Sequence, residues 1–121
     1  MSEQLIVTNP ATGETLAKVT IDSPESIETK LKAGYEAFKT FTKSSAYERA
    51  QLLNRWAELI IEDQENLAKI MTEENGKPLA ESRGEVLYAA SYLTWFAEEA
   101  KRLYGRTIPA NSTNKRLLVT R

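Results

Sequence analysis

The sequence predicts a mainly helical α+β fold, in which an N-terminal β-hairpin is followed by three to four helices and a C-terminal strand. Three observations predict this fold. Apolar and polar residues alternate near the amino terminus, as they do in a strand with one packed face. Apolar residues then recur at helical spacing after recognisable helix start signals. A run rich in leucine and valine follows the last turn-forming segment and is typical of a strand.

The first predicted element is a β-hairpin over about residues 5–21. Its second half is amphipathic, because Ala17, Val19 and Ile21 alternate with polar residues. One face of the hairpin should therefore pack, and the other should face solvent. The connecting residues 9–14 have the sequence NPATGE, which is rich in residue types that favour turns.

A helix over about residues 24–41 is predicted next. Ser23 is a good N-cap residue, and Pro24 stands at the first helical position, where its missing N–H is not needed. The apolar residues that follow are spaced by four, four and three positions, so they share one face.

A second helical pattern covers about residues 45–75. It opens with a capping box, in which Ser45 and Glu48 each bond to the other's backbone. The polar residues 62–66 interrupt the apolar pattern, and Asp and Asn compete there for backbone hydrogen bonds. The sequence leaves open whether this region is one long helix or two. Residues 75–78, with the sequence NGKP, end it.

The last predicted helix runs from about residue 79 to residue 104 and closes at Gly105. One stripe of apolar residues should pack: Val86, Ala90, Leu93, Ala97 and Ala100. A second flank carries four aromatic residues, which are more often core than the lining of a ligand tunnel: Tyr88, Tyr92, Trp95 and Phe96. So wide an apolar arc predicts a helix that is covered on more than one side.

A strand is expected over about residues 115–121. No later strand is available to it in this sequence. It should therefore pair backward along the chain, pair with another molecule, or remain as an exposed edge.

The composition excludes several classes of function. The 121 residues contain no Cys and no His, so a thiolate nucleophile, an imidazole base and soft metal ligands are all missing. With 16 basic and 17 acidic residues mixed along the chain, there is no basic stripe for nucleic acid. No apolar run approaches the length of a membrane span, and no secretory signal is recognisable, so a cytoplasmic location is expected. A chain of this size has room for one core, so any two-domain activity would be incomplete here.

Two local patterns suggest chemistry, but each has a plainer interpretation. Glu81 and Glu85 lie one helical turn apart and could hold a cation, yet a solvated helix face near Arg83 is favoured. Residues 75–78 could hold an anion, but a phosphate loop would need its glycines directly after a strand. A helix stop followed by a proline restart explains them better. Neither pattern predicts a metal or a cofactor site.

Seven short pieces, in this order and spacing, resemble the start of aldehyde dehydrogenases, and those from residue 83 onward are most similar to succinate-semialdehyde dehydrogenases. They are residues 9–14 (NPATGE), 74–78 (ENGKP), 83–85 (RGE), 88–91 (YAAS), 95–102 (WFAEEAKR), 104–105 (YG) and 107–109 (TIP). The resemblance covers nearly the whole chain.

The resemblance implies that this is the amino-terminal part of a longer enzyme with the α/β aldehyde dehydrogenase fold. Such an enzyme uses NAD or NADP, a cysteine nucleophile and a glutamate base to oxidise an aldehyde, here succinate semialdehyde to succinate. None of these catalytic residues, nor the glycine-containing cofactor turn, has a matching position in the chain. The segment alone is therefore expected to be inactive and to bind no NAD or NADP. The resemblance also implies a homo-oligomer, in which residues 115–121 begin the assembly arm.

One site residue is implied by the resemblance. The position of Tyr88 faces the aldehyde entrance in the family, and Tyr88 lies two residues after Val86, about 200° around the helix from the packed stripe.

The hypothesis that competes with an enzyme segment is a separate, non-catalytic helical interaction module that binds a partner, or itself, through an exposed apolar face.

Overall fold

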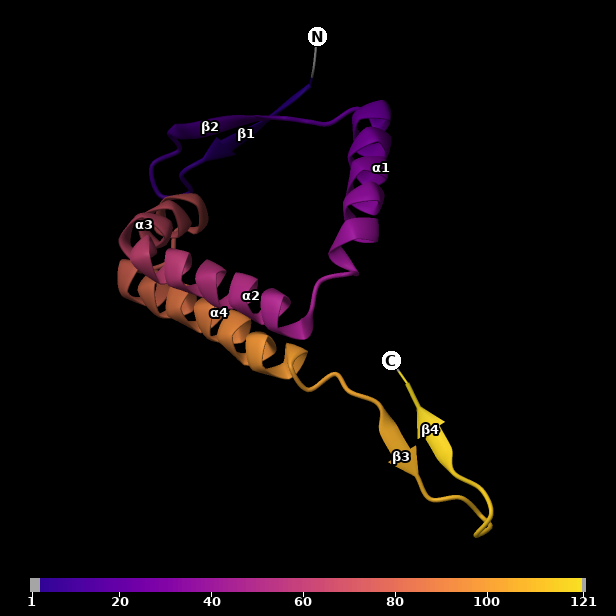
Figure 1. The fold of residues 1–121 in the computed structure, drawn as a ribbon. Helices are drawn as coiled ribbons and strands as arrows, with labels where there is room; N and C mark the ends of the chain where they lie inside the picture. Colours follow the sequence, from indigo (N-terminus) through magenta and orange to yellow (C-terminus); the bar gives the residue numbers. More distant parts are fainter. Residues whose placement is uncertain (1–2, 121) are drawn as a thin grey trace.

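The computed structural model describes residues 3–120, which form four helices and two separate β-hairpins (Figure 1). In chain order the elements are β1 (Gln4–Thr8), β2 (Thr15–Thr20), α1 (Pro24–Phe41), α2 (Ala46–Glu62), α3 (Gln64–Asn75), α4 (Leu79–Ala100), β3 (Arg106–Ile108) and β4 (Leu117–Val119). The mainly helical α+β fold predicted from the sequence is confirmed. Among the described residues, no helix is both long enough and apolar enough to cross a membrane.

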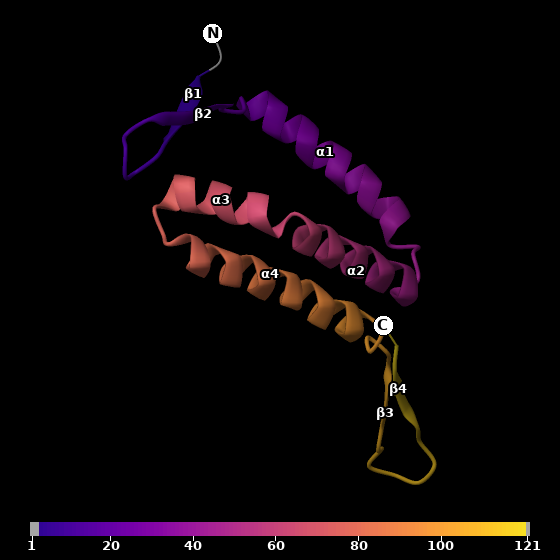
Figure 2. The same cartoon turned by 90° about the vertical axis from the view of Figure 1, so that its left-hand side faces the viewer.

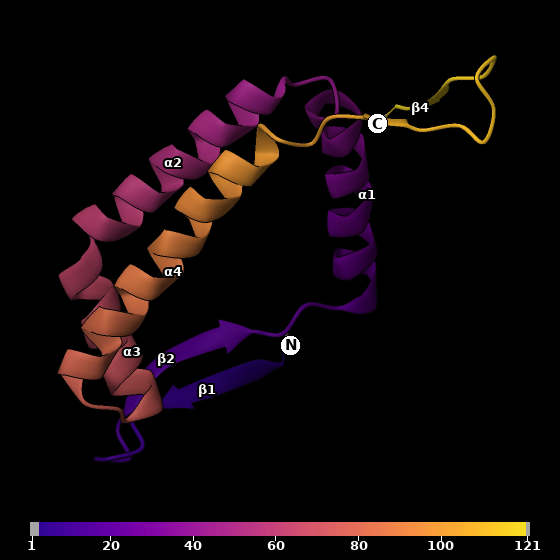
Figure 3. The same cartoon turned by 90° about the horizontal axis from the view of Figure 1, so that it is seen from below.

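Helices α2, α3 and α4 form one packed layer, in which α4 returns alongside α2 and α3 joins them at one end (Figures 1 and 3). Small side chains make up its interior. The buried residues are Ala50, Ala57, Ala68, Ser82, Val86, Ala90 and Ala97. Because the distance between helix axes depends on the side chains at the contact, these small residues allow the helices to approach closely.

The predicted packed stripe of α4 is confirmed, because Val86, Ala90 and Ala97 are buried and Leu93 and Ala100 are half-buried. The interpretation of the aromatic flank as core stays a prediction, because no element among the described residues covers this flank. Its four side chains are 48–65% exposed. They lie on the side of α4 that turns away from α2 and α3, so nothing within residues 3–120 covers them.

The sequence left open whether residues 62–66 divide the second helical region, and the structure has a break there, at Asp63 between α2 and α3. Asp63 leaves helical geometry, with φ −99° and ψ 15°. Its backbone N–H still donates to Leu59, its carbonyl accepts from Leu67, and its carboxylate accepts a bond from the Asn66 side chain at 3.3 Å. The predicted competition for backbone hydrogen bonds is not seen at Asp63, whose side chain bonds to another side chain and caps no backbone N–H.

The end of α4 differs from the prediction. The helix ends at Ala100 rather than near Tyr104, because Lys101 and Arg102 donate to carbonyls only three residues back and so tighten the last turn. Gly105 has a different role from a helix stop. A side chain there would collide with the carbonyl oxygen of Val119, so the glycine lets β4 pass close to the chain.

Each hairpin consists of two antiparallel strands. In the first, β1 pairs with β2, with a register shift between Val7 and Thr8. In the second, β4 pairs backward with β3, which selects one of the three outcomes left open by the sequence. The sequence did not predict β3, a strand of three residues. The predicted strand at residues 115–121 is shorter than expected, and Arg121 lies outside the described residues.

Helix α1 has the predicted bounds but stands apart from the layer (Figure 2). Its N-cap bond is present, since the Ser23 side chain accepts from the Ser26 N–H at 3.2 Å. None of its residues is buried, and its apolar face is open: Ile27, Leu31, Tyr35, Phe38 and Phe41 are 48–68% exposed.

Candidate functional site

Tyr88, the one predicted site residue, lies on the exposed flank of α4, with 62% of its surface accessible. Its hydroxyl group forms a hydrogen bond of 2.7 Å with the hydroxyl of Tyr92, one helical turn further along. The two rings meet edge to face, with centroids 4.9 Å apart and planes at 88°. The partner Tyr92 was not predicted as a site residue, although its spacing of four from Tyr88 was a sufficient signal.

The aromatic contact continues from Tyr92 to Phe96, whose ring lies 6.5 Å away at an angle of 30°. The bond from the Tyr88 hydroxyl, followed by partial burial, raises the pKa of Tyr92 above its ordinary value of 10.0. Tyr92 therefore stays protonated at neutral pH. The pair offers hydroxyl donors beside aromatic faces, and it offers no nucleophile.

A shallow hollow of about 350 Å³ adjoins this pair. It is lined by Ser91, Tyr92, Trp95 and Phe96, and it is largely apolar. Tyr88 does not line it and borders it only through Tyr92. A surface of this kind suits the apolar part of a small molecule or of a packed side chain, with the hydroxyl groups at one edge.

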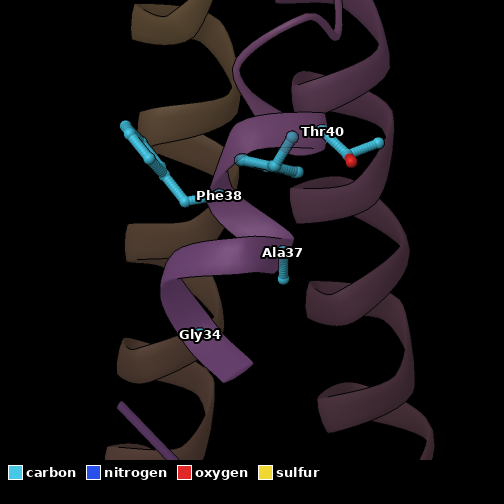
Figure 4. A pocket seen from close by; sticks show the side chains of 5 residues that line it. Gly34, Ala37, Phe38 and Thr40 are labelled. Atoms are coloured by element: carbon cyan, nitrogen blue, oxygen red, sulfur yellow. The ribbon is translucent and has the colours of Figure 1, made fainter. Parts of the chain in front are cut away.

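Other hollows lie on the described part of the chain, and two of them are the most apolar. One, of about 620 Å³, is lined only by α1 residues: Gly34, Ala37, Phe38, Thr40 and Phe41 (Figure 4). The other, of about 500 Å³, crosses the three helices of the layer, and Glu74 is its one charged residue. Neither combines a nucleophile with a base, so neither is a candidate active site.

The carboxylates of α4 lie on a solvated face, as their spacing suggested. Glu85 forms an ion pair with Lys77, and Arg83 holds Glu65 through two hydrogen bonds of 2.8 Å. The Arg83 bond lowers the pKa of Glu65 below its ordinary value. Glu81 is exposed. Within residues 3–120, no three side chains of the His, Cys, Asp or Glu type gather as a metal ion would need.

Residues 75–78 form the predicted helix stop. Gly76 adopts φ 81°, its N–H donates to the Thr72 carbonyl at 2.8 Å, and α4 restarts directly after Pro78. The described residues do not fit a dinucleotide phosphate, which needs a glycine-rich turn between a strand and a helix. Of the four helices only α1 follows a strand, and residues 21–23, which connect β2 to it, contain no glycine. The side chains of Ser23 and Ser45 accept hydrogen bonds from N–H groups at the starts of α1 and α2.

The described residues form a helical layer flanked by two hairpins, with an exposed aromatic flank, and the 121-residue sequence contains no cysteine and no histidine. The chain belongs to the aldehyde dehydrogenase family, whose family model matches residues 1–121.

Three curated relatives, all aldehyde or semialdehyde dehydrogenases, match nearly the whole chain. It is 50% identical over 98% of its length to a 3-sulfolactaldehyde dehydrogenase of Pseudomonas putida. It is 50% identical over 93% to a glutarate-semialdehyde dehydrogenase of Pseudomonas putida strain KT2440. It is 45% identical over 97% to an NADP⁺-dependent succinate-semialdehyde dehydrogenase of Escherichia coli. The chain spans 24% of the length of each of these relatives.

Solved structures agree with this assignment. An aldehyde dehydrogenase of Brucella melitensis matches 98% of the chain with a TM-score of 0.93 at 48% identity. A succinate-semialdehyde dehydrogenase of Burkholderia pseudomallei matches 96% with a TM-score of 0.90 at 42% identity. The chain covers 24% of each of those structures, so the likeness concerns this segment of the aldehyde dehydrogenase fold.

Proposed function

We propose that this chain is the amino-terminal part of an NAD(P)-dependent aldehyde dehydrogenase whose substrate is a short aldehyde with an anionic group at its other end. Succinate semialdehyde, oxidised to succinate, is the substrate we favour. The observation that supports this substrate class is the 45–50% sequence identity of the chain to three enzymes named for 3-sulfolactaldehyde, glutarate semialdehyde and succinate semialdehyde. All three names denote a short aldehyde with a sulfonate or carboxylate.

In this proposal the segment is a scaffold and contributes none of the reacting atoms. Its 121 residues contain neither Cys nor His, and its described residues offer no dinucleotide cradle. The thiolate nucleophile and the NAD(P) site would therefore be supplied by other residues of the enzyme. The 121-residue chain should show no turnover with succinate semialdehyde and NAD or NADP, and calorimetry should detect no saturable cofactor binding.

A graft tests the proposal directly. Residues 1–121 replace the matching segment of the glutarate-semialdehyde dehydrogenase from Pseudomonas putida, to which the chain is 50% identical. The chimera should oxidise succinate and glutarate semialdehydes, because residues that pack on the rest of that enzyme are expected to be retained. The matching segment of a Staphylococcus aureus betaine aldehyde dehydrogenase, 24% identical to this chain, is the control graft.

The two grafts give distinct outcomes. An active chimera with this chain and an inactive control would support a semialdehyde dehydrogenase segment. A soluble but inactive chimera would count against it. Preference of the chimera for an uncharged aldehyde would contradict the anionic substrate class while leaving the family assignment intact.

We further propose that Tyr88 borders the aldehyde entrance. Its ring is 62% exposed and fills no cavity among the described residues, so a packing role there is not needed. In the chimera, Tyr88→Ala should change KM or chain-length preference and leave thermal stability nearly intact. Tyr47→Ala is the matched control, since Tyr47 is also exposed, at 71%, but lies on α2.

The opposite result would make Tyr88 a packing residue. If it packs on the rest of the enzyme, Tyr88→Ala should cost about 3 kcal/mol or more through the cavity left behind, with substrate preference unchanged. Tyr88→Phe separates the hydroxyl bond to Tyr92 from the ring, because it removes only the bond.

A second candidate function is a helical interaction module. The open apolar face of α1 favours it, because contiguous exposed apolar patches mark interaction surfaces. In that case the chain would associate with itself or with a partner through this face. Light scattering measures whether the chain associates with itself and so distinguishes an interaction module from a segment of an enzyme. Self-association that Phe38→Glu abolishes would support the module, and a compact monomer at high concentration would oppose it. Assembly into a homo-oligomer through the β3–β4 hairpin remains part of the enzyme proposal.

A further inference from the structure

The two turn motifs at residues 9–14 and 75–78 supply no chemistry, yet they lie against each other (Figures 1 and 3). One belongs to the first hairpin, and the other joins α3 to α4. A methyl group placed on Gly76 would come within 2.9 Å of Pro10 Cγ and 3.8 Å of Pro10 Cβ. The proline ring therefore sits directly on the glycine backbone.

On the hairpin side, the turn is held by its own hydrogen bonds. The side-chain oxygen of Asn9 accepts the N–H of Ala11 at 2.9 Å, and its carbonyl accepts the N–H of Gly13 at 2.8 Å. The Asn9 N–H donates to the carbonyl of Glu14 at 2.8 Å. Because proline also fixes its own φ, the ring of Pro10 is presented in one position.

On the helix side, the turn is equally constrained. Gly76 has φ 81°, in the left-handed region that favours glycine, and donates to Thr72. Thr72 in turn shares a hydrogen bond of 2.9 Å with Ser82, the one buried polar residue within residues 3–120. Lys77 forms an ion pair with Glu85 on α4. A contact with this turn therefore reaches both α3 and α4.

The hairpin has little else to hold it to the helices. Its two strands pack extensively only on each other, and from residue 3 to residue 20 every residue is exposed except Val7 and Asn9, which are half-buried. We propose that Pro10 seated on Gly76 is the docking contact that fixes the first hairpin to the helical layer. Glycine is needed there for two reasons, its φ and its lack of a side chain. The contact involves only these turns and is independent of the reaction proposed above.

A double-mutant cycle in the full chain tests the contact, with amide hydrogen exchange as the readout. Pro10→Ala removes the ring, and Gly76→Asn adds a side chain of a type that tolerates a positive φ. Each change should speed exchange in β1 and β2 by about tenfold while the Ala90 amide in α4 stays protected. The double variant should be no faster than either single variant, since both remove the same contact.

Gly13→Asn is the matched control, because Gly13 has a similar φ of 77° and no atom within 4 Å of an added Cβ. It should change hairpin exchange by less than about threefold. The proposal is overturned if the two changes are additive, if Gly13→Asn matches Gly76→Asn, or if Gly76→Asn leaves the hairpin unchanged. If Gly76→Asn unfolds the chain, Pro10→Ala alone decides, and unchanged hairpin exchange in that variant overturns the proposal.

Discussion

Helix α1 and the layer of α2, α3 and α4 begin from similar sequence signals and end in different environments. Both α1 and α2 start at a serine N-cap, run for 18 and 17 residues, and carry an apolar face. Yet α1 buries no residue, whereas the three helices of the layer bury seven. Local signals therefore explain where a helix forms, and they do not explain what it packs against.

The residues at the contacts account for the difference. Layer helices meet through alanine, serine and one valine, which are short enough for close approach. On α1 the apolar face consists of large residues that need a broad partner surface, and no element within residues 3–120 provides one. The layer and α1 therefore differ in the size of the side chains on their apolar faces, rather than in hydrophobicity.

Overpacking should give the largest contrast. Ala97 is fully buried on α4, so Ala97→Leu should lower the free energy of unfolding by about 1–3 kcal/mol, because the helices must move apart. Ala37→Leu makes the same change on α1, where Ala37 lines an open hollow (Figure 4), and should change it by less than about 0.5 kcal/mol. Urea denaturation of both variants measures the difference. Equal losses would show that α1 is packed after all.

Helix capping should give a smaller contrast. Ser45→Ala breaks the capping box of α2, in which Glu48 N–H donates to Ser45 and the Ser45 N–H donates to Glu48 at 2.6 Å. This should cost about 1 kcal/mol of global stability. The matched change Ser23→Ala should loosen only α1, because that helix is not coupled to the layer. Hydrogen exchange of each helix, read beside the global unfolding curve, distinguishes local from global loss.

The smallest expected effect is on how the melting temperature depends on pH. The Arg83 hydrogen bonds lower the pKa of Glu65 from its ordinary 4.5, so its stabilising contribution is present above that pH and disappears as the pH falls through the lowered pKa. Glu65→Gln should therefore reduce Tm slightly at pH 7, and the difference from the unmodified chain should be smaller at about pH 3.

Asp22 provides the matched test on α1. Its bond to Lys30 also lowers its pKa, but the pair ties α1 only to the residues just before it. Asp22→Asn should leave the Tm of the layer unchanged at both pH values. A drop as large as that of Glu65→Gln at pH 7 would contradict the separation of the two regions.

The sequence predicted the elements whose signals are local. The caps at Ser23 and Ser45 and the stop at Gly76 appear where their residue types indicated. For residues 62–66 the sequence left one helix or two open, and the structure has two. Predictions that depend on distant residues were weaker. The strand β3 was missed because its three residues become a strand only by pairing with β4, which begins nine positions after β3 ends.

The candidate site shows the same division. Periodicity placed Tyr88 off the packed stripe of α4, and the structure agrees. Periodicity could not show that the aromatic flank lies uncovered, since a helix that is apolar on two sides reads the same whether or not a neighbour is present. The resemblance to aldehyde dehydrogenases, confirmed by the family match, supplied the entrance hypothesis that geometry alone did not.

The alanine-lined interior of the layer has a consequence for interpreting variants of this protein. A survey of all single substitutions would find its intolerant positions at inconspicuous residues such as Ala68 and Ala90, which are 0% and 1% exposed. Gaining two methyl groups there should do more harm to folding of the layer than losing most of the Tyr47 ring, which is 71% exposed. A scale that ranks substitutions by the size of the original residue would predict a larger loss of stability at Tyr47 than at Ala68 or Ala90, which is the opposite of what we expect.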